Sequence, residues 1–271
     1  MIRTAILVIV LVVSMSGAAK AEQPLLIFAA ASMTNAVQDI ADAFEAAGNG
    51  RIITVFDATS RAARQMQQGA PAHVLVSANS QWAEWLIACG PGDAATRHQI
   101  AGNELVLIGA TSDDGTIAPN TPVAFEAVLP LIRGSRVAIA DPIGVPAGIY
   151  ARQSLMAIGI WEQVEPQLVQ GDTVRTVLNW VRTGTAETGI VYATDARVAD
   201  DVRVLSSIPS ALHGPIAYEV VATQDAPPVA DRFIAFLLGQ DGQTILNGYG
   251  FAPASDDTYT DEPAFQTECG S

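Results

Sequence analysis

Short apolar runs alternate along the chain with segments whose apolar residues recur every three or four positions. The run at 25–31 (LLIFAAA), for example, is followed by Val37, Ile40 and Phe44 at helical spacing. The predicted strands are 25–31, 52–58, 73–77, 104–110, 136–142, 189–195 and 216–223. The predicted helices are 33–44, 62–68, 80–88, 146–158 and 173–183. This alternation indicates an α/β fold, with mostly parallel sheets flanked by helices.

Two polar segments that contain Pro and Gly, 111–122 and 204–216, interrupt this alternation. They enclose a middle unit, so the flanking parts of the chain would form one discontinuous lobe. We therefore expect lobe 1 to comprise residues 22–106 and 213–254, and lobe 2 to comprise residues 107–212. Residues 255–271 are acidic and lack periodicity, which predicts a disordered tail.

The amino terminus has the pattern of a secretory signal peptide. Arg3 gives it a positive start, residues 5–13 are a continuous apolar run, and Ala19-Lys20-Ala21 provides small residues around a cleavage site. The apolar run is too short to span a membrane. We expect residues 1–21 to be removed and the protein to reside in the periplasm. No Cys follows the cleavage site, so a lipid anchor is not expected.

The charge balance narrows the choice of partners. The chain has 14 Lys and Arg against 28 Asp and Glu, and Lys20 is its only lysine. This acidity argues against a nucleic-acid partner, because phosphate binding needs clustered cations. Cys89 and Cys269 exclude a disulfide-rich scaffold and a cysteine-only zinc site. A bond between them and two free thiols both remain open.

Candidate catalytic groups are sparse. The sequence has no G-x-S-x-G elbow, and its three histidines, His73, His98 and His213, lie far apart along the chain. A secreted α/β hydrolase with Ser32 or Ser60 as nucleophile is an alternative, but it lacks an evident His–acid partner. We do not expect an enzyme or a bound cofactor.

Small or hydroxylated residues follow several predicted strands and begin the next helix. Ser32 follows the first strand, Thr59 and Ser60 follow the second, and Pro146-Ala147 begins the helix at 146–158. Carboxyl ends of parallel strands face one crevice, and helix N-termini there present N–H groups and partial positive charge. The pattern indicates a site for an anion.

Four motifs carry a family resemblance: AAASMTNAVQDIADAF (29–44), DATSRAARQMQQGAPAHVLVSA (57–78), ADPIGVPAGIYARQSL (140–155) and TGIVYATDA (188–196). In order and spacing they resemble the periplasmic molybdate-binding proteins of ABC importers, which are type II periplasmic solute-binding proteins. The similarity spans residues 25–253. It implies two lobes joined by a hinge, a molybdate or tungstate oxyanion bound in the cleft between them, a membrane permease as partner and a monomeric state.

The resemblance also implies which residues bind the oxyanion. Carried over position by position, they are Ser32, Thr59, Ala147, Val174 and Tyr192, with Ser60 as a secondary candidate. The metal would enter only as part of that oxyanion. The hydroxyls of Ser32, Thr59 and Tyr192 and the backbone N–H groups of Ala147 and Val174 would donate to it.

Two positions depart from the family pattern. Thr59 stands where the family usually has Ser, and its extra methyl could narrow the cavity. His73 stands where Asp is common, and we expect it to affect lobe packing rather than the choice of ligand. Because of Thr59, a protein that binds another oxyanion, or tungstate alone, remains an alternative. A sensor or scaffold that has lost transport also remains an alternative.

Overall fold

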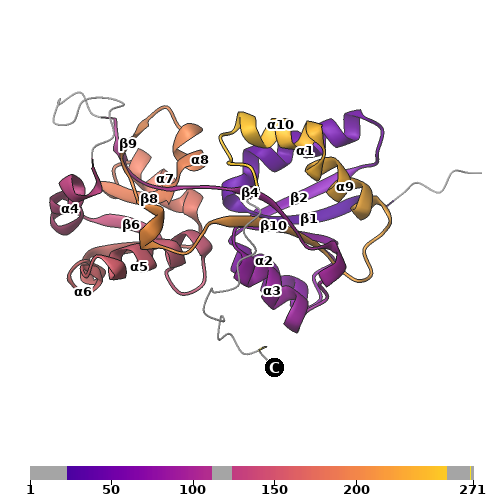
Figure 1. Ribbon diagram of the computed structural model, residues 1–271, viewed down its shortest axis with the longest axis horizontal. Coiled ribbons are helices and arrows are strands. Elements are labelled where there is room, and N and C mark those ends of the chain that lie inside the picture. The colour runs from indigo at the N-terminus through magenta and orange to yellow at the C-terminus, as the bar shows by residue number, and fades with distance from the viewer. Residues whose placement is uncertain (1–22, 112–123, 255–268, 270–271) are drawn as a thin grey trace, which may run out of the picture.

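A computed structural model of the protein describes residues 23–111, 124–254 and 269. These residues form two lobes that lie side by side (Figure 1), each built around a five-stranded sheet with helices on both faces. The two-lobed α/β architecture that the sequence predicted is confirmed. The predicted signal peptide, almost all of the polar segment 111–122 and the predicted tail, except Cys269, lie outside the described residues.

The first lobe contains the chain's first sheet. Its strands are β1 (Leu25–Ala30), β2 (Ile52–Asp57), β3 (Val74–Ser77), β4 (His98–Gly102) and β10 (Ala217–Ala222), in the spatial order β2-β1-β3-β10-β4. β1 pairs in parallel with β2 and β3, whereas β10 runs antiparallel to β3 and β4. The sheet is therefore mixed but mostly parallel, because only β10, which enters it from the second lobe, runs against the other strands.

Helices cover both faces of this sheet. They are α1 (Thr34–Ala46), α2 (Thr59–Gln67), α3 (Ser80–Cys89), α9 (Val229–Leu238) and α10 (Gln240–Gly248), with short 3-10 helices at Ala31–Met33 and Ala94–Thr96. α1, α9 and α10 lie on one face and α2 and α3 on the other (Figure 1). Ile27 packs into the core under the first group, and its neighbour Phe28 packs with α2 and α3. Both faces are apolar, which explains the continuous apolar runs.

The second lobe repeats this arrangement. Its strands are β5 (Leu105–Ala110), β6 (Val137–Ala140), β7 (Leu168–Gly171), β8 (Thr188–Tyr192) and β9 (Val202–Ser207), in the order β7-β6-β8-β5-β9. Its helices are α4 (Phe125–Gly134), α5 (Pro146–Ala157), α6 (Trp161–Val164), α7 (Val174–Arg182) and α8 (Ala193–Arg197), with 3-10 helices at Glu165–Gln167 and, in the return to the first lobe, Ser210–Leu212. β6 pairs in parallel with β7 and β8, whereas β5 is antiparallel to its neighbours, so this sheet is also mixed.

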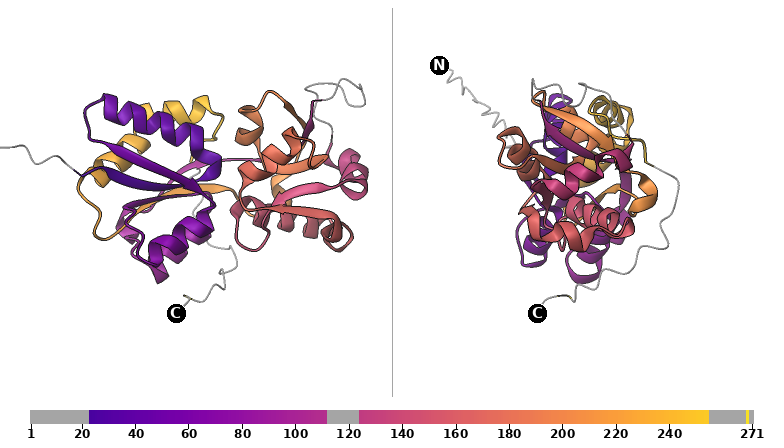
Figure 2. Two further views of the ribbon diagram at one scale, coloured as in Figure 1. Left: turned by 180° about the vertical axis from the view of Figure 1, so that it is seen from behind. Right: turned by 90° about the vertical axis from the view of Figure 1, so that its left-hand side faces the viewer.

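The chain passes between the lobes twice, once between β4 and β5 and once between β9 and β10 (Figure 2). The boundary expected after residue 106 falls inside β5, so the first crossing comes slightly earlier, at residues 103–104. The segment 204–216 was predicted as a loop, yet its first residues belong to β9. The polar residues Arg203 and Ser206 interrupt the apolar pattern there, although both are buried in the strand.

A disulfide joins Cys89, the last residue of α3, to Cys269, with 5.3 Å between the Cα atoms. The pairing that the sequence left open is therefore present. No helix within the described ranges is both long and apolar enough to cross a membrane.

Candidate functional site

A cavity lies between the lobes, with about 220 Å³ of space between the surrounding atoms, part of it open to solvent. All five residues expected to bind the oxyanion line it: Ser32, Thr59, Ala147, Val174 and Tyr192. The secondary candidate Ser60 is buried but does not line the cavity. Its side chain lies instead near Gly144, in the loop that precedes α5.

The topology explains why residues so far apart in sequence meet here. Ser32 directly follows β1, Thr59 follows β2 and Tyr192 is the last residue of β8. Ala147 and Val174 stand in the first turns of the helices that follow β6 and β7. The carboxyl ends of these five parallel-paired strands therefore point at the cavity from both lobes, as expected for ligand sites of α/β sheets.

Two helices of the second lobe present backbone N–H groups to the cavity. α7 begins at Val174, and its cap Thr173 accepts a 3.1 Å hydrogen bond from the N–H of Thr176 through Oγ1. α5 begins at Pro146, and its first intrahelical bond runs from the N–H of Ile149 to the carbonyl of Val145. The N–H groups of Val174 and Ala147 therefore have no intrahelical acceptor. They and the two helix dipoles favour an anion at this position.

α5 reaches the cavity because it packs closely against the end of β6. A Cβ atom added at Gly148 would lie 2.2 Å from the carbonyl oxygen of Ala140 and 2.3 Å from that of Asp141. No side chain can occupy that space. Gly148 thus fixes where the N-terminus of α5 stands and with it the N–H of Ala147.

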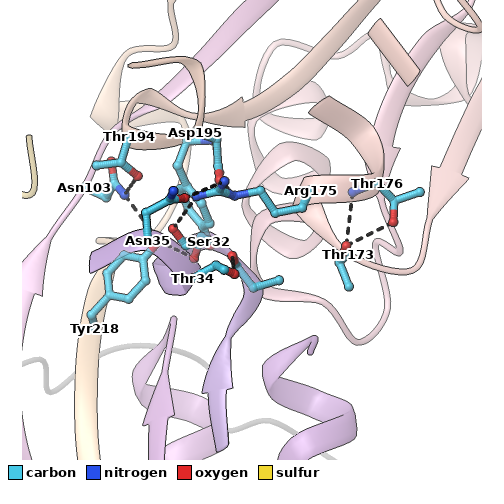
Figure 3. Close-up of polar contacts among 12 residues, drawn as sticks. Ser32, Thr34, Asn35, Asn103, Thr173, Arg175, Thr176, Thr194, Asp195 and Tyr218 are labelled. Carbon is cyan, nitrogen blue, oxygen red and sulfur yellow. Dashed lines mark hydrogen bonds and ion pairs between the residues drawn. The ribbon is translucent and has the colours of Figure 1, made fainter. Parts of the chain in front are cut away.

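Two hydroxyl groups of the first lobe each have a neighbouring hydrogen-bond donor on the side away from the cavity. The Oγ1 of Thr59 accepts a 3.1 Å hydrogen bond from the N–H of Ala78, which leaves its proton available to the cavity. The Oγ of Ser32 lies 2.9 Å from the Oη of Tyr218, which also accepts a 3.3 Å bond from the Nδ2 of Asn103 (Figure 3). With Tyr218 donating to Ser32, the proton of Ser32 also becomes available to the cavity.

Tyr192 supplies a third hydroxyl. Its side chain is buried, and its Oη has no hydrogen-bond partner among the described residues. Burial raises the pKa of Tyr192 well above its usual value, and the neighbouring Tyr218 adds to this effect. The group therefore stays protonated and acts as a donor. A buried hydroxyl without a partner favours a ligand that accepts its hydrogen bond.

The lining carries little formal charge. Among the described residues that line the cavity, only Asp57 carries a formally charged side chain. Its Oδ1 accepts from the N–H of Ala58 at 2.7 Å and lies 3.2 Å from Arg61. That carboxylate is thus turned to the backbone and to a cation. The cavity attracts anions through N–H and O–H dipoles rather than through a lining cation.

Direct contacts hold the lobes together around the cavity. The Nε1 of Trp82 in α3 donates to the carbonyl of Gly144 at 2.8 Å, and Arg61 lies 3.7 Å from Asp172. Arg175 donates to the carbonyl of Ser32 and to the side chain of Asn35 across the cleft (Figure 3). Trp82, Arg175 and Tyr218 are not predictable as cleft residues from the sequence, because only the folded chain brings them there.

Neither a hydrolase nor a metal-ion site finds support in the described contacts. The Ser32 hydroxyl is paired with Tyr218 rather than with a histidine. Residues 23–111, 124–254 and 269 contain no cluster of three His, Cys, Asp or Glu that could hold a metal ion. His73 accepts from the N–H of Leu26 through Nδ1 at 3.0 Å, a contact within the first lobe, and it does not line the cavity.

Comparisons with known proteins agree with this geometry. The sequence profile of the family described as "Bacterial extracellular solute-binding protein" matches residues 25–252. The chain is 34% identical to the molybdate-binding protein ModA of Escherichia coli, over 85% of this chain and 89% of that protein. It is 32% identical to ModA of Haemophilus influenzae, over 93% and 97%. The structure of the Azotobacter vinelandii periplasmic molybdate-binding protein shares the fold, with a TM-score of 0.74, 20% identity and coverage of 85% and 100%.

Proposed function

The chain belongs to the family of bacterial extracellular solute-binding proteins, and on that premise we propose that it captures molybdate in the cavity between its lobes. The relatives named for molybdate binding cover most of its length, and its five predicted site residues line one cavity. The bound oxyanion is then handed to the permease of an ABC importer. The protein acts by binding and release and catalyses no reaction.

The observation that carries this proposal is the convergence of hydrogen-bond donors on the cavity. Three hydroxyls and two helix N-termini converge on it, and no cation lines it within the described residues. Molybdate is a dianion whose four oxygens all accept hydrogen bonds. A fixed shell of donors replaces its water with charge-assisted hydrogen bonds, which are stronger than those between neutral groups.

Selectivity follows from the same shell. Hydrogen phosphate carries a P–OH group. The converging groups are donors, and the lining carboxylate of Asp57 is turned to the N–H of Ala58 and to Arg61, so the site opposes that extra proton. Sulfate has shorter bonds than molybdate, so it cannot reach all the donors at once. Each buried donor left unpaired costs about 1–3 kcal/mol. Tungstate is nearly the size of molybdate, so we expect the two to compete closely.

Location and assembly complete the proposal. The apolar run at 5–13 and the small residues before Glu22 support export through a signal peptide. No Cys stands at the cleavage site, which favours a soluble periplasmic protein over a lipid-anchored one. Each of the two lobes contributes donors to one cavity, so a single chain completes the site and a monomer suffices.

Calorimetric titration with molybdate, tungstate and sulfate tests the proposal. We expect one-to-one binding of molybdate and tungstate and at least a hundredfold weaker binding of sulfate, about 3 kcal/mol for two unpaired donors. Tyr192→Phe removes one donor and should weaken molybdate binding at least tenfold, an estimate of about 1.5 kcal/mol for a bond to a charged acceptor. Ser60→Ala, outside the lining, should bind as the wild type does.

Two outcomes would overturn it. Sulfate binding within tenfold of molybdate would contradict selection by the donor shell. If Tyr192→Phe bound molybdate as tightly as the wild type, the buried hydroxyl of Tyr192 would not be a ligand of the anion. If Ser60→Ala rather than Tyr192→Phe weakened binding, the site would lie nearer Gly144 than the cavity described here.

A further inference from the structure

Arg175, the second residue of α7, joins the lobes with its whole guanidinium group (Figure 3). Its Nε lies 2.7 Å from the Oδ1 of Asp195 in its own lobe. On the other side of the cleft, one terminal nitrogen donates to the Oδ1 of Asn35 at 3.0 Å, and the other to the carbonyl oxygen of Ser32 at 3.1 Å. One side chain thus makes one contact within the second lobe and two with the first.

The partner within the second lobe is firmly anchored. Asp195 has no solvent exposure, and its Oδ2 accepts from the N–H of Tyr192 at 3.3 Å. An ion pair with a fully buried carboxylate is costly to break, because the separated charge would remain without a partner. When the lobes part, Arg175 therefore stays with Asp195, and the bonds to Asn35 and Ser32 are the ones that open.

These contacts touch the oxyanion site directly. Arg175 follows Val174 in the first turn of α7 and binds the backbone of Ser32, while its partner Asp195 binds the backbone of Tyr192. Two of the five residues expected to bind the anion, Ser32 and Tyr192, are therefore bonded to this ion pair, and a third, Val174, is adjacent to Arg175 in the chain. By contrast, the ion pair Arg61–Asp172, which does join the two lobes, spans 3.7 Å between half-exposed side chains.

We propose that Arg175 is a positioning residue that locks the lobes in the closed, anion-holding arrangement by donating across the cleft to Ser32 and Asn35. It does not touch the anion. It sets how long the cleft stays closed, so its loss should raise the rate of anion release. This inference rests on the function proposed above, since it assumes that the cavity holds an oxyanion.

Stopped-flow measurement of molybdate release, with tryptophan fluorescence as the signal, tests the lock. Trp82 lies at the seam between the lobes and is a suitable reporter. Arg175→Lys keeps the charge but not the three-pronged geometry, and we expect release about tenfold faster or more. Asn35→Ala leaves the Asp195 pair intact and should speed release about threefold. Association rates should change little, since most affinity differences between variants appear in dissociation.

Arg182→Lys is the matched control. Arg182 lies on the same helix and also forms a 2.7 Å ion pair, with Asp201, but both partners are exposed and belong to the second lobe. Its release rate should equal that of the wild type. The unfolding temperature without molybdate separates locking from general stability, because Asn35→Ala should leave it unchanged. The double variant Arg175→Lys, Asn35→Ala should release molybdate no faster than the two single effects combined would predict. Both substitutions remove the same hydrogen bond, the one between Arg175 and Asn35.

The outcomes separate this inference from the function on which it rests. If the wild type binds molybdate and both Arg175→Lys and Asn35→Ala release it at the wild-type rate, the lock is wrong. If Arg175→Lys alone is faster and also unfolds earlier, Arg175 only stabilises its own lobe and the lock is again wrong. If the wild type does not bind molybdate, the proposed function fails. The lock is then judged by small-angle scattering, in which Arg175→Lys should be more extended than Arg182→Lys.

Discussion

The two lobes contribute different kinds of donor to the same cavity. The first lobe offers side-chain hydroxyls, each with a donor behind it: Tyr218 lies behind Ser32, and the N–H of Ala78 lies behind Thr59. The second lobe offers backbone N–H groups at the starts of α5 and α7, together with the buried hydroxyl of Tyr192. A hydroxyl can be removed by one substitution, whereas a backbone N–H remains whatever the side chain is.

This difference predicts how substitutions should act. In the first lobe, the identity of the side chain decides whether a donor is present at all. At Ala147 and Val174, the position of the helix decides whether the donor points at the anion. The largest effects in the second lobe should therefore come from changes that move a helix.

Gly148→Ala should have the largest effect. The new Cβ would lie within 2.3 Å of two carbonyl oxygens, so the start of α5 must move away from β6 and take the N–H of Ala147 with it. We expect loss of measurable molybdate binding and about 3 kcal/mol of destabilisation, typical of an overpacked core. Calorimetry and urea unfolding measure the two effects. Gly248→Ala, at the end of α10 with open space around its Cβ, is the control and should affect neither.

Ser32→Ala and Val174→Ala compare the two lobes directly. Ser32→Ala deletes a donor and should weaken molybdate binding by at least tenfold, from about 1.5 kcal/mol or more for a bond to a charged acceptor. Val174→Ala keeps the N–H and should stay within about threefold, although removal of buried methyl groups lowers stability by about 1–2 kcal/mol. Titration of both variants measures this contrast. Equal losses of affinity would show that the two lobes do not differ as proposed.

The fold was largely accessible from the sequence, because both faces of each sheet are covered and the strands are continuous apolar runs. The strands β4, β7 and β9 were not predicted, since polar residues such as His98, Gln170 and Arg203 interrupt their apolar patterns. The meeting of five residues at one cavity was expected from the family resemblance. The contacts of Tyr218 and Arg175 with Ser32 were not, because contacts between residues more than a hundred positions apart leave no local signal.

The pair Arg175–Asp195 should give the second lobe a pH dependence of its own. Burial raises the pKa of Asp195 to about 6, only partly offset by Arg175, against a usual value of 3.8. Between these values the folded chain keeps a proton that the unfolded chain releases. The stability that Asp195 contributes is therefore fully present below about pH 4 and is lost as the pH rises through about 6.

Asp195→Asn makes this dependence measurable. Relative to the wild type, the variant should gain unfolding free energy as the pH rises from 4 to 7, by about 1.4 kcal/mol per unit at most. Urea unfolding without molybdate at several pH values gives the difference. Asp172 and Asp201, whose pKa values are lowered by hydrogen bonds from Thr176 and Arg182, are common to both proteins and cancel. A difference that stays constant with pH would contradict the titration of Asp195.

Tyr218→Phe tests the donors that stand behind the hydroxyls. It leaves Ser32 in place but removes the hydroxyl 2.9 Å from its Oγ, so the Ser32 proton is no longer directed into the cavity. We expect a loss smaller than that of Ser32→Ala, about threefold to tenfold for one neutral hydrogen bond. A freed Ser32 can also accept, so hydrogen phosphate should compete better than it does with the wild type. Competition titrations measure both effects, and unchanged discrimination would show that Tyr218 only fills space.

Thr59→Ser should have the smallest effect on binding. The hydroxyl is held by the N–H of Ala78, and Ser can accept the same 3.1 Å bond, so the donor into the cavity is kept. What changes is one buried methyl, worth about 0.8 kcal/mol of stability by its area alone. We expect molybdate affinity within about threefold of the wild type and an unchanged ratio of molybdate to tungstate affinity. If hydrogen-bond donors determine the affinity, loss of the methyl group changes neither, because the donors are kept. If that ratio shifts instead, the methyl of Thr59 sets the size of the cavity, and the first lobe selects by shape as well as by its hydroxyls.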